Sequence, residues 1–184
     1  ANATHLMQLY DVGMSSMVVQ EAFALSELAT AIKRPANEIA TLQARAKSVG
    51  AKIIKHLWDE EFGIFANKFQ NGSFYPRISP TSFYALMTRA ATNEQAAAIV
   101  NNWLLSPRHF CISPNGDFSG NADTCFWGLP SIEASDPAFP PLGYWRGYVW
   151  GPQSMLTYWS LQYYDHVPDV RKGRKALISQ HRQL

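Results

Sequence analysis

The sequence predicts an all-α fold in which about six helices form antiparallel pairs, with one small β-hairpin and one long aromatic loop. Apolar residues recur at steps of three and four along much of the 184-residue chain, which is the pattern of amphipathic helices. Proline or glycine interrupts this pattern, and the short links predict that successive helices are antiparallel neighbours. Between residues 106 and 147 the periodicity disappears, and Pro, Gly, Ser, Asp and aromatic residues predominate.

The first predicted helix pair covers residues 14–33 and 36–58. Arg34-Pro35 separates the two helices, because a proline restricts the residue before it and suits the first turn of a new helix. The apolar stripe of the first helix is Met14, Met17, Val18, Ala22, Leu25, Leu28, Ala29 and Ile32. The stripe of the second is Ile39, Leu42, Ala46, Val49, Ile53 and Leu57.

A β-hairpin is predicted after this pair. Residues 64–69 and 74–75 flank Asn71-Gly72, a dipeptide typical of tight two-residue turns. Gly63 is expected to end the preceding helix, since glycine readily adopts the left-handed conformation that follows many helices.

Four more helices are predicted, over residues 80–90, 93–105, 151–164 and 168–182. Prolines open three of them, and Asn93 is expected to cap the remaining one. The last helix carries a basic cluster that we interpret as a solvated face: Arg171, Lys172, Arg174 and Lys175. The long loop before residue 147 is of a length that is usually functional inside a compact domain.

The composition excludes several classes of protein. Apolar residues make up 47% and charged residues 16%, so a core can form and a disordered chain is excluded. The net charge of +2 gives no electrostatic basis for binding nucleic acid or an anionic membrane, and no apolar run is long enough to span a bilayer. We expect a single partial domain over residues 1–184, because the sequence resembles the middle of a longer chain.

Cysteine and asparagine patterns bear on the cellular compartment. Cys111 and Cys125 cannot form a four-ligand zinc site alone; the short loop between them would allow a disulfide, which the sequence leaves undecided. Asn2-Ala3-Thr4 and Asn71-Gly72-Ser73 fit the N-glycosylation pattern, which is common by chance but compatible with a secretory route. No signal peptide is evident, and the localisation stays open.

The densest chemical signal lies in residues 143–152, the aromatic block. It alternates aromatic rings, glycines and Arg146. A sugar ring has an apolar C–H face that stacks on Trp and hydroxyls that accept hydrogen bonds from a guanidinium. The alternative interpretation is that Trp145 and Trp150 belong to the core and that Arg146 forms a buried ion pair.

Carboxylates and histidines provide weaker signals. Glu133 and Asp136 share one loop, and a glycosidase needs two carboxylates, but Asp136 before Pro137 is more typical of a turn. Asp11 is expected either to face a site at the mouth of the first helix or to cap that helix. The five histidines show no metal-binding spacing, so no metal is predicted.

Several segments together resemble glycoside hydrolase family 63, which contains processing α-glucosidases and is close to the trehalases. The resemblance runs from about residue 9 to about residue 165. It rests on Asp11-Val12-Gly13, Leu57-Trp58-Asp59-Glu60-Glu61-Phe62-Gly63, Gly128-Leu129-Pro130-Ser131-Ile132, Asp136-Pro137-Ala138-Phe139, Tyr144-Trp145-Arg146-Gly147 and Trp150-Gly151-Pro152.

The resemblance implies part of an (α/α)6 toroid and an inverting hydrolase that acts on α-glucosides without a cofactor. An oligosaccharide or a small glucoside is the expected ligand. The family's catalytic acid and base fall outside the matched segments, upstream and downstream, so this chain is expected to supply sugar contacts without the catalytic pair. The expected contacts are Tyr144, Trp145, Arg146, Trp150, Trp127 and Asp11. Exposed faces of the inner helices are then expected to cause self-association.

Three alternatives remain open. A carbohydrate-binding or scaffold fragment would share the fold without hydrolysis. A sugar epimerase or a polysaccharide lyase would need a His or Tyr acid/base, for which His56 and His109 are the candidates. A helical-repeat interaction module would place its aromatic residues according to the repeat.

Overall fold

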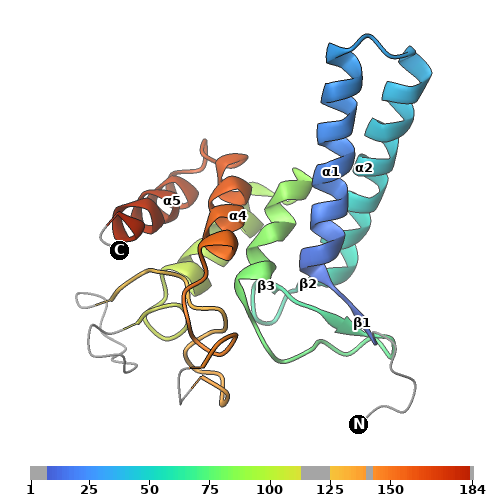
Figure 1. Cartoon of the computed structure of the whole chain (residues 1–184). Coiled ribbons are helices and arrows are strands. Elements are labelled where there is room, and N and C mark those ends of the chain that lie inside the picture. The colour runs from blue at the N-terminus through green and yellow to red at the C-terminus, as the bar shows by residue number, and fades with distance from the viewer. Residues whose placement is uncertain (1–7, 113–124, 140–142, 183–184) are drawn as a thin grey trace.

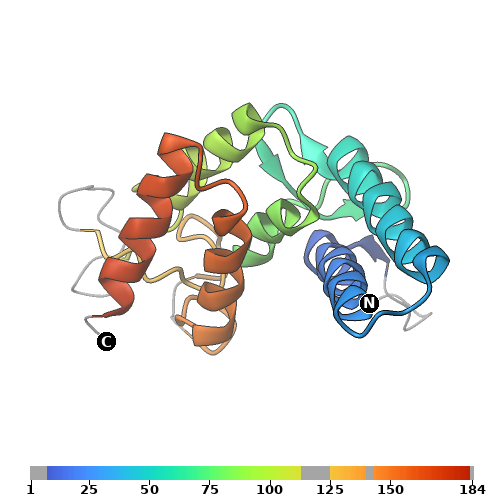
Figure 2. The ribbon, with the colours of Figure 1, turned by 90° about the horizontal axis from the view of Figure 1, so that it is seen from above.

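The computed structural model describes residues 8–112, 125–139 and 143–182. Its helices form an arc of three inner and three outer segments (Figures 1 and 2). The inner segments are α1 (Val12–Ala31), the 3-10 helix η1 (Pro80–Thr88) and α4 (Gly151–Gln162). The outer segments are α2 (Ala36–Leu57), α3 (Asn93–Ile99) continued by the π-helical turn η2 (Val100–Leu104), and α5 (Pro168–His181). The predicted all-α architecture of antiparallel pairs is confirmed.

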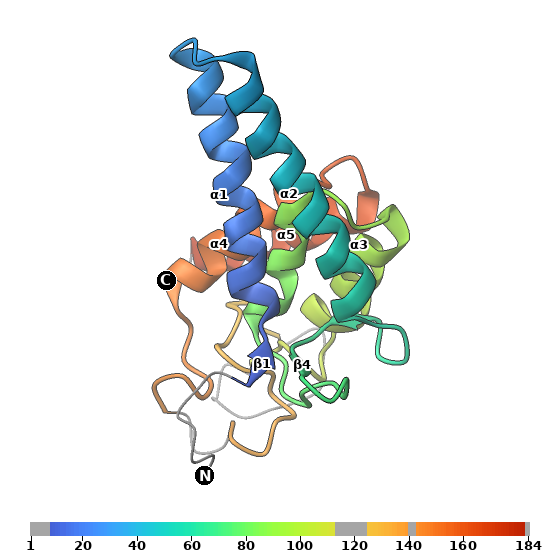
Figure 3. The ribbon, with the colours of Figure 1, turned by 90° about the vertical axis from the view of Figure 1, so that its right-hand side faces the viewer.

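Chain order explains the arc. Each inner segment is followed by an outer one, and consecutive inner segments are in contact, α1 with η1 and η1 with α4. The three inner segments therefore begin at the same end of the molecule (Figure 1). The short strands and the loop before α4 gather at that end, which we call the mouth (Figure 3).

The helix predicted over residues 80–90 is a 3-10 helix rather than an α-helix. Every residue of η1 except Thr81 is buried, and the segment passes between α1 and α4. A 3-10 helix is narrower than an α-helix, which suits a segment with neighbours on all sides. At the mouth, Gly13 packs so closely on η1 that a β-carbon added there would lie 2.7 Å from Thr81 Cβ.

The predicted hairpin is divided between two small sheets. β3 (Ile64–Phe65) pairs with β2 (Trp58–Asp59), and β4 (Lys68–Phe69) pairs with β1 (Leu9–Tyr10), both antiparallel. A tight turn is present but lies one residue earlier than predicted: Gly72 N donates to Phe69 O at 2.9 Å, so Gln70 and Asn71 are its central residues, Gly72 follows at a φ of +90°, and one bridge joins Lys68 and Phe74. The two halves of the predicted strand differ in burial, since Ile64 and Phe65 lie in the core whereas Lys68 and Phe69 are half-buried. Each half therefore pairs in a different sheet.

Two predicted helix boundaries were wrong. Gly63 does not end α2, which stops at Leu57; at a φ of +61° it turns the chain from β2 into β3. Thr92, not Asn93, caps α3: the Thr92 hydroxyl accepts from Gln95 N, and the Gln95 side chain accepts from Thr92 N in a complete capping box.

The inner side of the arc carries apolar side chains that nothing in the described residues covers. Helix α1 buries Val12, Val19 and Ala22 on one face yet exposes Met14 (60%) on another, and Ile32, directly after the helix, is 62% exposed. Other exposed apolar side chains are Met17, Val18, Leu25 and Leu28 on α1 and Met155 and Trp159 on α4. Most of the apolar stripe that the sequence predicted is thus exposed, and α1 has apolar side chains on two faces, which is typical of a helix that is buried on more than one side. No helix in the described part of the chain is both long and apolar enough to cross a bilayer.

We predict a loss of stability at alkaline pH from two buried tyrosines. Burial raises the pKa of Tyr84 and of Tyr164 from 10.0 to about 12. Above pH 10 the unfolded chain releases these phenol protons while the folded chain retains them, so this stability is complete below pH 10 and is lost as pH rises toward 12. The loss should be on the order of 2 kcal/mol per tyrosine.

Urea unfolding at a series of pH values measures this loss. The double variant Tyr84→Phe, Tyr164→Phe has no phenol to titrate at these positions, so its stability should fall less steeply across the same window. An equally steep fall in the variant would contradict the assignment.

Candidate active-site mouth

The aromatic block forms an exposed wall at the N-terminus of α4. Trp145 and Trp150 stack with centroids 4.7 Å apart and an interplanar angle of 22°, and Tyr144 meets both edge-on. Trp150 Nε1 donates a hydrogen bond to Tyr144 O at 3.1 Å, which ties the half-buried indole to the turn before it. Tyr144 and Trp145 remain 62% and 52% exposed. The wall therefore presents aromatic surface to solvent beside a fixed ring.

Arg146 is exposed and makes no ion pair among the described residues. Gly143 and Arg146 form a tight turn in which each backbone N–H donates to the other's carbonyl. A β-carbon at Gly143 would lie 3.0 Å from an Arg146 guanidinium nitrogen, so the glycine leaves room for the side chain to fold over it. The interpretation of Trp145 as core and Arg146 as a buried ion pair is wrong, because both side chains are exposed.

The two most specific segments of the sequence lie side by side. Ser131 N donates to Tyr148 O at 3.0 Å, Gly147 N donates to Ser131 Oγ at 3.1 Å, and Pro130 bridges to Val149. Residues 128–131 thus support the aromatic block from beneath. The backbone here is unusual: the fully buried Leu129 has a φ of +62°, Tyr144 has a φ of +38° and Gly147 has a φ of +111°. Such conformations outside glycine are costly and cluster at functional sites.

Asp11 caps α1, as one of its two interpretations predicted. Its Oδ1 accepts from Met14 N at 2.7 Å and its Oδ2 accepts from Asn67 Nδ2 at 3.0 Å. The Asn67 Oδ1 in turn accepts from Val12 N at 2.8 Å. The pair joins the start of an inner helix to the segment between β3 and β4, so both carboxylate oxygens of Asp11 have structural partners.

Glu133 and Asp136 are buried, and each has its own partners. Glu133 Oε2 lies 2.5 Å from His109 Nδ1 and accepts from Ser135 Oγ at 2.8 Å. Asp136 Oδ1 accepts from Ala138 N at 2.7 Å, which confirms the turn interpretation, and lies 3.7 Å from the Arg77 guanidinium.

The His109–Glu133 pair was missed by the sequence analysis. Its members are 24 residues apart, and they meet where the ring of His109 stacks on Trp103 at 4.1 Å. They line a cavity of about 560 Å³ together with Asp59, Phe62 and Asn102 among others. His56 is elsewhere, in a groove between α2 and β4, so the two candidate histidines do not share a site. Among the described residues, no group of His, Cys, Asp and Glu could hold a metal ion.

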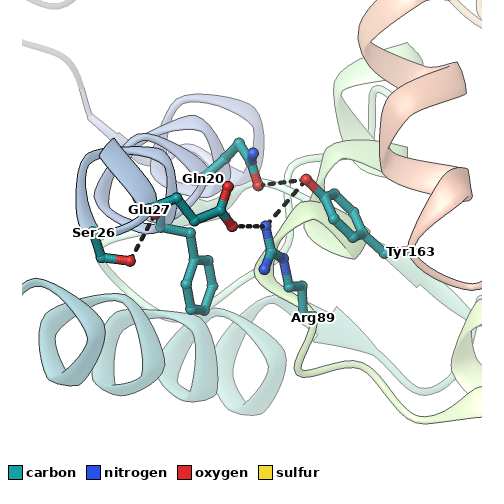
Figure 4. Close-up of polar contacts among 6 residues, drawn as sticks. Gln20, Ser26, Glu27, Arg89 and Tyr163 are labelled. Atoms are coloured by element: carbon teal, nitrogen blue, oxygen red, sulfur yellow. Dashed lines mark hydrogen bonds and ion pairs between the residues drawn. The ribbon is translucent and has the colours of Figure 1, made fainter. Parts of the chain in front are cut away.

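A second unpredicted cluster joins the inner segments away from the mouth. Arg89 follows η1 at a φ of +59°; its guanidinium lies 4.4 Å from the ring centroids of Phe23 and Tyr163. It also donates to Glu27 at 3.4 Å and to Tyr163 Oη at 3.2 Å, and Tyr163 donates to Gln20 (Figure 4). The cluster holds α1 and α4 in fixed positions on either side of η1.

Trp127 is half-buried, on the segment that follows the Ile112–Phe126 bridge, and no ring contact found among the described residues joins it to the aromatic block. Cys111 and Cys125 form a disulfide, which settles the pairing that the sequence left undecided. The interior of that loop, residues 113–124, and the Asn2 acceptor pattern lie outside the described residues.

Comparison with known families agrees with this geometry. Residues 1–184 match the model of the mannosylglycerate hydrolase MGH1-like glycoside hydrolase domain. The chain belongs to this family. The predicted resemblance to glycoside hydrolase family 63 is thereby confirmed.

This glycoside hydrolase domain is similar in sequence to two curated proteins and in fold to several solved structures. Mannosylglycerate hydrolases MGH1 and MGH2 of Selaginella moellendorffii are each 32% identical over 98 residues, which is 51% of this chain and 16% of each relative. The family 63 mannosylglycerate hydrolase of Thermus thermophilus, in complex with glucose, aligns over 95% of this chain and 40% of its own, with a TM-score of 0.66 and 18% identity. Neutral trehalase Nth1 of Saccharomyces cerevisiae aligns over 87% of this chain and 29% of its own, with a TM-score of 0.62 and 20% identity.

These alignments show the fold. The arc of three inner and three outer segments is part of an α/α toroid of the glycosidase type, as predicted. The chain spans about a sixth of the curated relatives and about two fifths of the Thermus enzyme that it matches.

We predict that Asp11 contributes to stability as a helix cap. Asp11→Ala should lower the free energy of unfolding by about 0.5–2 kcal/mol, because it leaves Met14 N without its acceptor. Asp11→Asn should lose less than Asp11→Ala, since the asparagine amide oxygen still caps Met14 N, although no second oxygen remains to accept from Asn67 Nδ2. Chemical denaturation of the three proteins measures the difference. Equal losses in both variants, or none in Asp11→Ala, would contradict the capping role.

Proposed function

We propose that this domain binds a sugar at the mouth as part of an inverting glycoside hydrolase, with the aromatic block as the binding wall. The observation that carries the proposal is the exposed Trp145, stacked on Trp150, with an Arg146 beside it that has no ion-pair partner among the described residues. An indole held against a second indole offers a rigid apolar face to a sugar ring, and a guanidinium without an ion pair is available to hydroxyl or carboxylate oxygens.

The names of the relatives narrow the substrate class. Both curated relatives are mannosylglycerate hydrolases, and the Thermus enzyme has been crystallised with glucose and with D-glycerate. We propose a small glycoside of this kind, such as mannosylglycerate, ahead of the α-glucoside that the sequence suggested. A glycerate carboxylate suits the two-pronged donor geometry of Arg146. Tyr144, Trp150, Trp127 and Asp11 are proposed as further contacts, Asp11 through the end of α1 that it caps.

The catalytic acid and base are proposed to lie in sequence beyond these 184 residues. Inversion needs one carboxyl group that protonates the leaving oxygen and a second, about 6.5–9.5 Å away, that activates water. The three carboxylates that the sequence singled out are engaged with other partners: Asp11 with Met14 and Asn67, Glu133 with His109 and Ser135, and Asp136 with Ala138 and Arg77. Residues 1–184 then form one partial domain.

A non-catalytic carbohydrate-binding role is the alternative. It would use the same wall and would leave the substrate intact, so turnover by the whole protein distinguishes the two. An epimerase or lyase based on His109 has less support. That imidazole contacts Glu133 in the cavity of about 560 Å³ that both residues line, and not at the aromatic block.

We predict that Arg146→Ala and Trp145→Ala each lower kcat/KM of the whole protein for mannosylglycerate by about tenfold or more, equivalent to about 1.4 kcal/mol of lost transition-state binding. Helix content measured by circular dichroism should not change, because both side chains are exposed. Arg45→Ala, which removes an exposed arginine from outer helix α2, is the matched control and should retain full activity. Parental kcat/KM in both mouth variants would exclude the proposed wall.

We also predict that the isolated 184-residue chain self-associates through the inner side of the arc, because its exposed apolar side chains gain by burial. Light scattering should give a mass above 20.6 kDa, and the chain should bind an apolar dye. Leu28→Glu and Ile32→Glu together should reduce both signals, whereas Ala44→Glu on the exposed surface of α2 should not. A stable monomer that binds no dye would refute this prediction.

A further inference from the structure

One sequence pattern has no part in the proposed sugar site. Asn71-Gly72-Ser73 is an N-glycosylation acceptor pattern, and the fold places it at the tip of the turn that follows β4. All three residues are exposed. β4 pairs with β1 at the start of α1, whereas the aromatic block precedes α4, the inner segment at the other end of the arc (Figures 1 and 2).

The Asn71 side chain is exposed and is held in the turn through its amide oxygen. Asn71 Oδ1 accepts from Ser73 N at 3.0 Å and from Ser73 Oγ at 2.8 Å, which occupies the oxygen within the turn. No hydrogen bond found among the described residues uses Asn71 Nδ2. A β-carbon placed on the neighbouring Gly72 would meet no atom within 4 Å, so the space around the tip is open. An oligosaccharide on Nδ2 would therefore fit without any displacement of the fold.

The state of the cysteines is an independent observation. The chain has two cysteines, Cys111 and Cys125, and they form a disulfide with each other. Disulfides persist in oxidising compartments and are rare in the cytosol, where thiols are kept reduced. In eukaryotes the compartment that supports such a bridge is also the one in which N-linked glycans are attached.

We infer that Asn71 carries an N-linked glycan and that the protein folds in the oxidising lumen of the secretory pathway. The donor is a lipid-linked oligosaccharide pyrophosphate. A bond forms between Asn71 Nδ2 and the anomeric carbon, the anomeric C–O bond to the pyrophosphate breaks, the lipid pyrophosphate leaves with the electron pair, and Nδ2 gives up one proton. This inference does not depend on the proposed hydrolase activity.

Mass spectrometry of the protein isolated from its own organism tests the inference. Peptide:N-glycosidase should lower the intact mass and convert Asn71 to Asp, and peptide mapping separates this site from Asn2. Without prior reduction, Cys111 and Cys125 should resist a thiol-reactive maleimide. A peptide with wholly unmodified Asn71, or free thiols at both cysteines, would overturn the inference.

Variants of the whole protein, secreted from eukaryotic cells, test the site itself. Asn71→Gln and Ser73→Ala should each abolish the mass shift at this peptide, because each removes one element of the acceptor pattern. Ser73→Thr is the matched control and should retain the shift, since threonine also completes the pattern. Secreted parent protein that lacks the shift at this peptide would refute the site.

Discussion

The structure depends on the burial of η1 between the two long inner helices. Phe83 and Leu86 are completely buried, and Phe83 packs edge-on against Phe110 from the loop that leads toward the mouth. Because α1 and α4 both pack on η1, the three inner segments are held together with their N-termini at the same end of the molecule (Figure 1). Everything that gathers at the mouth, including the Asp11–Asn67 pair and the aromatic block, is positioned relative to that one buried segment.

The helix pairs could be predicted because their determinants are local. The apolar spacing of residues 14–33, the break at Arg34-Pro35 and the proline starts of later helices each specify a structure within a few residues. Errors arose where tertiary packing outweighed local preference. η1 is a 3-10 helix because α1 and α4 pack closely on it. The segment after Gly63 is divided between two sheets because β1, which directly precedes α1 in the chain, pairs with β4.

The candidate site was predictable in its composition but not in its pairings. The aromatic block could be recognised because its tryptophans and Arg146 lie within a few residues of one another. The His109–Glu133 pair and the Arg89 cluster join residues that are 24 to 143 positions apart, and a single sequence carries no signal for such contacts. The exposed inner face is an intermediate case: the sequence shows the apolar stripe over residues 14–33, and only the structure shows that most of this stripe lacks a partner among the described residues.

The backbone of Leu129 has a consequence for ligand recognition. Gly128 is required for space, since a β-carbon there would collide with the ring of Phe126. In this pair it is Leu129, and not the glycine, that adopts the left-handed backbone conformation. Such a conformation costs on the order of 1–3 kcal/mol, which full burial of a leucine side chain offsets at about the same magnitude. A segment whose backbone strain is offset by the burial of its own side chain has few alternative conformations of similar free energy. Under the proposed function, this support preorganises the wall, so a sugar that docked there would lose little of its binding free energy to ordering the protein.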